Sequence, residues 1–156
     1  PRPGLHHIPG QAALADGDLA VCLRYGDVVC DLSVDMVDDT TATIHLAQAG
    51  GGADVAAHLT FLMRLDEGLA TYAGEQTLTD ADLRLDGGDA AWFGQGTWRC
   101  AIPAGACLRW PVLPHNPYRK DGHATLEEAR STLTVPLRAG QPRTVTLRVD
   151  ATNAPR

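Results

Sequence analysis

The residues of this chain that could do acid–base or metal chemistry gather in one proline-rich stretch, PVLPHNPYRKDGH, at positions 111–123. His115 and His123 flank Asp121 there, and two imidazoles with a carboxylate could bind zinc or act as acid and base. Their spacing matches no metal or catalytic motif, and exposed loop histidines are common. A small hydrolase or lyase that uses these three residues is therefore the alternative function, and the main interpretation assigns no catalytic residue.

A second group of possible ligands is the acidic run around Gly87 and Gly88. Carboxylates near glycines suit calcium, but the run lacks the ligand spacing and the bidentate glutamate of a calcium-binding helix–loop–helix. Leucines alternate with the acids, so the acids are more simply the exposed face of a short strand. We expect no metal and no cofactor, and the alternative metal ligands are Asp82, Asp86 and Asp89.

Aromatic residues concentrate just before and within the proline-rich stretch. Rings with interleaved hydrogen-bonding groups are what a sugar or a peptide needs for binding. Trp98 and Trp110 have a second interpretation, as core residues that face each other across a hairpin. The predicted ligand-binding surface consists of Trp92, Trp98, Trp110, Tyr118, Arg119 and Asp121.

The four cysteines form two local pairs, Cys22/Cys30 and Cys100/Cys107, and each pair brackets a turn. Such clustering predicts disulfides, and hence a secreted or periplasmic protein. The apolar alternation, however, turns Cys30 and Cys100 inward and the other two outward, so local pairs require a bulge that shifts the register. Local pairs are the leading expectation, and long-range pairs or reduced thiols are the alternatives.

The elements that must position these residues are strands. Apolar and polar residues alternate along 55–65, and shorter stretches at 41–47, 133–137 and 144–150 do the same, with glycine-rich turns between them. This pattern predicts an all-β fold, an antiparallel β-sandwich of roughly eight to ten strands or a barrel-like closure of them. The inward residues of the longest and last strands are Leu59, Phe61, Val145 and Leu147.

Only one helical signal is present. The sequence Thr125-Leu126-Glu127-Glu128 fits a capping box, and it predicts a single helical turn near residues 125–130. The chain of 156 residues is long enough for one core, so we expect one domain over 1–156, with residues 1–15 extended or poorly ordered.

Charge and hydropathy narrow the possible partners. A net charge of −6 argues against a nucleic-acid partner, because phosphate binding needs a basic surface. No stretch approaches the roughly 18 apolar residues of a transmembrane span. We therefore expect an extracytoplasmic, non-catalytic recognition module that binds a glycan or a protein at the aromatic surface. A structural subunit of a larger assembly is a further alternative, and the oligomeric state stays open.

Overall fold

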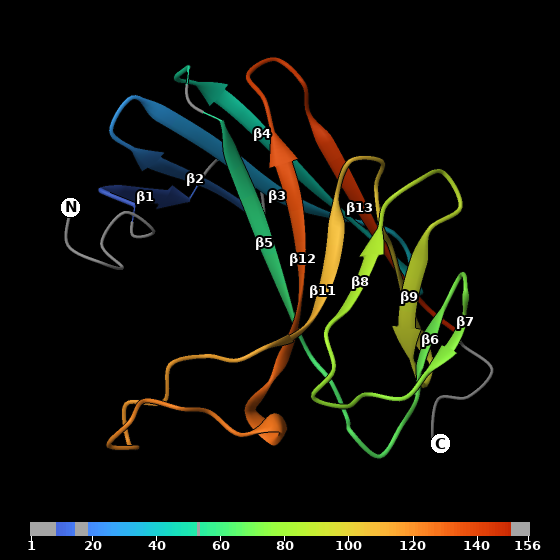
Figure 1. Cartoon of the computed structure of the whole chain (residues 1–156). Coiled ribbons are helices and arrows are strands. Elements are labelled where there is room, and N and C mark those ends of the chain that lie inside the picture. Colours follow the sequence, from blue (N-terminus) through green and yellow to red (C-terminus); the bar gives the residue numbers. More distant parts are fainter. Residues whose placement is uncertain (1–8, 15–18, 53, 151–156) are drawn as a thin grey trace.

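The protein, seen in a computed structural model that describes residues 9–14, 19–52 and 54–150, consists of two antiparallel sheets that pack face to face (Figure 1). The nine-stranded sheet has the spatial order β1 (Gln11–Leu14), β2 (Ala20–Tyr25), β3 (Val28–Asp38), β4 (Thr41–Gly50), β13 (Arg143–Val149), β10 (Trp98–Ala101), β9 (Trp92–Gln95), β6 (Leu69–Thr71) and β7 (Gly74–Gln76). The four-stranded sheet has the order β5 (Val55–Leu62), β12 (Arg130–Leu137), β11 (Cys107–Val112) and β8 (Leu83–Asp86).

The predicted all-β antiparallel sandwich is confirmed, and the sheets do not close into a barrel. The described residues form more strands than the eight to ten expected, because several are only three or four residues long. The long strands are rich in β-branched residues with apolar side chains at every second position, as in β12, RSTLTVPL, whose inward residues are buried. The predicted strand at 55–65 ends earlier, at Leu62.

The chain crosses repeatedly between the sheets. After the meander β2–β3–β4 it enters the small sheet as β5, returns for β6 and β7, and crosses again before and after β8. The connection 102–106 is one of these crossings, because β10 lies in the large sheet and β11 in the small one. The predicted hairpin that would set Trp98 opposite Trp110 is therefore wrong.

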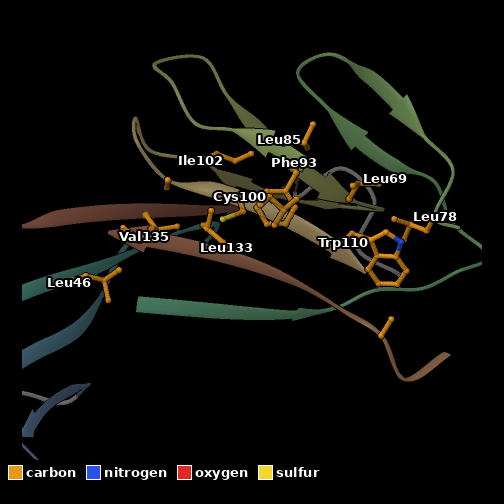
Figure 2. Close-up of a cluster of buried hydrophobic side chains, with 14 of the residues drawn as sticks. Leu46, Leu69, Leu78, Leu85, Phe93, Cys100, Ile102, Trp110, Leu133 and Val135 are labelled. Atoms are coloured by element: carbon orange, nitrogen blue, oxygen red, sulfur yellow. The ribbon is translucent and has the colours of Figure 1, made fainter. Parts of the chain in front are cut away.

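The core lies between the two sheets, as Figure 2 shows, and is made mainly by β9, β10, β11, β12 and β13. Val145 is fully buried, as predicted. Leu59, Phe61 and Leu147 face the core as predicted but remain partly exposed. Phe61 is on an edge strand, which is consistent with its partial burial.

The disulfide prediction is wrong, because all four cysteines are free in this structure. The turn between β2 and β3 pairs Leu23 with Cys30 and Cys22 with Asp31, so the two thiols lie on opposite faces of the sheet. Cys100 is buried in the large sheet, whereas Cys107 lies on the small one. The faces predicted from alternation are correct for Cys22 and Cys30, and they prevent the local pair.

The single helical turn is confirmed as η2 (Leu126–Glu128), and Glu128 Oε2 accepts the backbone N–H of Thr125 at 2.8 Å. Of the segment 1–15, residues 11–14 form β1, and residues 1–8 and 15 lie outside the described residues. No helix in the described part of the chain is long and apolar enough to cross a membrane.

Candidate functional site

The proline-rich loop does not assemble a catalytic site. Strand β11 extends to Val112, and the remaining loop is braced by its own polar groups: the amide of Asn116 donates to Glu128 Oε1 at 2.6 Å, and Asp121 Oδ1 accepts the backbone N–H of His123 at 3.1 Å. The side chains of His115, Asp121 and His123 are exposed. Within the described residues, no hydrogen bond or ion pair joins any two of these three side chains, so the geometry offers no acid–base pair.

The loop is also separated from the first of the predicted aromatic residues. Trp92 pairs with Ala101, next to the connection that leads into β11, and β11 then runs away from it before the loop begins. A strand of six residues spans about 20 Å. Trp92 therefore lies near the start of β11, and Tyr118 comes after its far end. Arg99 covers the Trp92 ring, with its guanidinium carbon 4.6 Å from the ring centroid.

The other two tryptophans belong to the core. Trp110 is buried, and its Nε1 donates to the carbonyl of Thr79 at 2.8 Å (Figure 2). Trp98 stacks on Phe61 with 5.6 Å between ring centroids. Of the predicted surface, Tyr118, Arg119 and Asp121 are exposed together on the loop, and Tyr118 is 96% exposed.

The acidic run likewise forms no metal site. Asp86 Oδ1 accepts a hydrogen bond from the Arg84 guanidinium at 2.9 Å. Both side chains lie on the exposed face of β8, as the alternation of leucines and charged residues indicates. Nowhere in the described residues do three or more histidine, cysteine or acidic side chains come close enough to hold a metal ion, and Asp82 and Asp89 are no exception.

The structure instead contains a cleft that the sequence analysis missed, between the large sheet at β2 and β3 and the edge of the small sheet at β5. Its volume is about 570 Å³. Most of its wall is aliphatic, and the polar residues Tyr25, Asp31, Asp54 and His58 border it. The side chains of Asp31 and His58 lie on the outer faces of their sheets, Asp31 beside Cys22 and His58 beside Thr134. The apolar residues that line it are Leu23, Cys30, Leu32, Leu46, Val55, Ala56, Ala57, Leu59 and Leu137.

The cleft exists because the large sheet extends further than the small one. One row of paired residues crosses four strands of the large sheet, from Leu46 on β4 through Leu32 and Val21 to Leu14 on β1. All four lie on the same face. Leu46 is 2% exposed and Leu14 is 87% exposed, so coverage by the small sheet ends between them. Strands β1 to β3 overhang the edge of β5 (Figure 1).

The chemistry of the cleft suits binding. Burial raises the pKa of the Cys30 thiol, the one thiol among the lining residues, and the charge of Asp31 raises it further. A neutral thiol is a poor nucleophile. His58 Nδ1 lies 3.1 Å from the hydroxyl of Thr134, so its ring is held toward β12. The lining residues include no lysine or arginine, and Asp54 is the acidic residue among them whose side chain is not assigned to the opposite face of the large sheet.

Two features of the sequence indicate this region without revealing the cleft. Residues 55–62, VAAHLTFL, carry no charge, and Leu23 and Leu32 alternate with polar neighbours as an inward face would. Which of these faces another sheet covers depends on the number of strands in each sheet. Comparison of the chain with protein-family models, with curated proteins and with solved structures finds no match among any of them.

Proposed function

We propose that this protein is a non-catalytic recognition module that binds a partner protein through the cleft between β3 and β5. The observation that supports this proposal most directly is the cleft itself, about 570 Å³ of mainly aliphatic surface with a few polar groups. Binding sites for ligands commonly have this volume and composition. Each aliphatic side chain of a partner that fills it contributes about 1.5–3 kcal/mol before the costs of association are subtracted.

A protein ligand is favoured over a glycan. Sugar binding needs exposed aromatic faces with hydrogen-bonding groups beside them, and both Trp98 and Trp110 pack into the interior. The cleft walls are aliphatic, with Tyr25 as their one aromatic ring. The enzyme that would use His115, Asp121 and His123 has no support from the geometry of the loop.

The proline-rich loop remains a proposed second contact surface. Tyr118 and Arg119 project from a loop that is held by its own hydrogen bonds, so little entropy is lost when a partner contacts them. The secreted or periplasmic location also remains a prediction. Because the cysteines are free, disulfide bonds no longer support it.

Selection from a displayed library of random peptides tests the cleft. The Ala57→Trp variant places an indole in the cleft, and Ala104→Trp makes the same change in an exposed turn. The unchanged protein and Ala104→Trp should enrich the same peptides, and Ala57→Trp should bind them at least about tenfold more weakly at an unchanged melting temperature.

Two outcomes contradict this site. One is equal binding by Ala57→Trp, which places the peptides elsewhere; Tyr118→Ala combined with Arg119→Ala then tests the loop. The other is enrichment of no peptide by the unchanged protein.

A further inference from the structure

Strand β5 differs from the other strands at the sheet edges. The edges β1, β7 and β8 are only three or four residues long, and β8 carries the ion pair Arg84–Asp86. Strand β5 has eight residues in unbroken register with β12, and it contains no charged residue and no proline. Proteins normally protect a sheet edge with short strands, charges, prolines or bulges. None of these devices is present in β5.

We infer that an extended segment of a partner protein pairs with β5 as a fifth strand of the small sheet, with apolar side chains at every second position and basic residues beside them. This inference rests on the proposed function, because it identifies the ligand of the cleft. Every other residue of β5 directs its backbone N–H and C=O away from β12, and within the described residues no strand pairs with that side.

The overhang of the large sheet supplies the second half of the site. A strand added beside β5 lies above β2 and β3, so its inward side chains contact Leu23 and Leu32, which the small sheet leaves partly exposed. Its other side chains face the solvent. Backbone pairing gives such a complex its affinity, and the pockets for alternate side chains give it specificity.

A second whole copy of the chain does not fit this edge. Antiparallel pairing of two β5 strands with their apolar faces on the same side relates the copies by a two-fold axis perpendicular to the sheet. Both large sheets then lie on the same side, where the overhanging β1–β3 of each copy would occupy the space of the other. A single extended strand meets no such obstacle.

The charge of the lining specifies the polar part of the partner. Asp54 borders the cleft at the start of β5, and no lysine or arginine among the lining residues offsets it. Asp31 also borders the cleft, but its side chain lies with that of Cys22 on the opposite face of the large sheet. A fatty acid or another apolar anion is therefore repelled, whereas lysine or arginine beside an apolar strand is attracted. The chain as a whole, with a net charge of −6, adds to this preference.

Hydrogen exchange of the backbone amides tests the pairing directly. In the free protein, alternate amides of β5 should exchange fast and the others slowly. The probe is a synthetic peptide of about ten residues in which valine alternates with threonine and two lysines stand at each end. On its addition the fast amides of β5 should slow at least about tenfold, with little change in β8.

Two methylated forms of the probe separate backbone pairing from side-chain binding. One carries methyl groups on the valine amides and the other on the threonine amides, and only one set can face β5. For a given strand direction one of the two forms cannot pair, so at least one form should bind more weakly than the unmethylated probe. Strand addition is wrong if both forms bind as tightly as the unmethylated probe. It is also wrong if the β5 amides stay fast while the cleft-blocked Ala57→Trp variant still loses the peptides selected by display; the cleft function then stands.

The charge requirement has its own test. A probe with glutamates in place of the lysines should bind about two- to fivefold more weakly, and the variant Asp54→Asn should reduce this difference. An equal affinity for both probes in the unchanged protein contradicts the basic partner.

Sedimentation of the protein alone tests whether a second copy occupies the edge of β5, and it should show a monomer. A dimer that Ala57→Lys abolishes would make a second copy the occupant.

Discussion

At the scale of single residues, the position of a side chain on one face of its strand decides its role in this protein. Cys22 and Cys30 are close in sequence, yet they lie on opposite faces of the large sheet and cannot approach each other. Trp110 and Tyr118 were both predicted to bind a ligand, and the first is buried while the second is exposed. Two predictions follow from these positions.

All four thiols should react with a chromogenic disulfide reagent in denaturant without reductant, because none is paired. Under native conditions Cys100 should react last: burial raises its pKa from 9.0 to about 12, which lowers its thiolate fraction roughly a thousandfold. Absorbance of the released thiol counts the groups. A count near zero would restore the disulfides and the oxidising compartment.

Trp110→Phe should lower the free energy of unfolding by about 1–3 kcal/mol, because it leaves the carbonyl of Thr79 without its donor and removes part of a buried ring. Tyr118→Phe is the matched control and should change stability by less than about 0.5 kcal/mol. Denaturant titration of both variants measures the difference, and equal effects would mean that Trp110 is not part of the core.

At the scale of elements, aromatic contacts and hydrogen bonds join the C-terminal end of β5 to the large sheet. The Phe61 ring lies 5.0 Å from that of Phe93 in an edge-to-face contact and stacks on Trp98. Beyond the end of β5, the buried side chain of Gln95 accepts the backbone N–H of Arg64 at 2.8 Å and donates to its carbonyl at 2.6 Å. The opposite end of β5, from Val55, borders the open cleft.

Phe61→Ala should therefore destabilise the protein by about 3 kcal/mol, at the lower end of the range for buried phenylalanines because the ring is partly exposed. Its neighbour Leu62 faces the solvent and is 79% exposed, so Leu62→Ala should cost less than about 0.5 kcal/mol. Urea melts of the two variants provide the comparison. A larger effect at Leu62 would mean that the faces of β5 are reversed.

At the scale of the whole molecule, one core joins the two sheets. Its buried residues come from both, among them Leu46, Phe93 and Val145 on the large sheet and Leu108 and Leu133 on the small one. Separation of the two sheets would expose this cluster of buried side chains to water. The single domain expected over 1–156 stays a prediction, and calorimetry can test it.

Heating should give a single unfolding transition whose calorimetric enthalpy equals its van't Hoff enthalpy, because the sheets share their buried surface. Differential scanning calorimetry measures both quantities. Two resolved transitions would show that the overhanging strands β1–β3 unfold separately from the remainder of the sandwich.

The local features of the fold follow from short stretches of the amino-acid sequence. Alternation with period two requires strands with one apolar face, and it correctly assigned the inward side of Val145 and of Phe61. The capping box at Thr125 correctly predicted a short helical turn, because its hydrogen bonds connect residues three apart in the chain. Each of these features depends on neighbours within a few positions, so the chain needs no distant contact to specify them.

Tertiary structure decided which strands share a sheet, and with that the candidate site. The segment between Cys100 and Cys107 has the pattern of a hairpin, yet it crosses between sheets, since the same alternation fits a strand in either one. The cleft depends on nine strands facing four, a mismatch between segments far apart in the chain. Local patterns fix which face of a strand is apolar, and only the complete packing fixes which apolar faces remain uncovered.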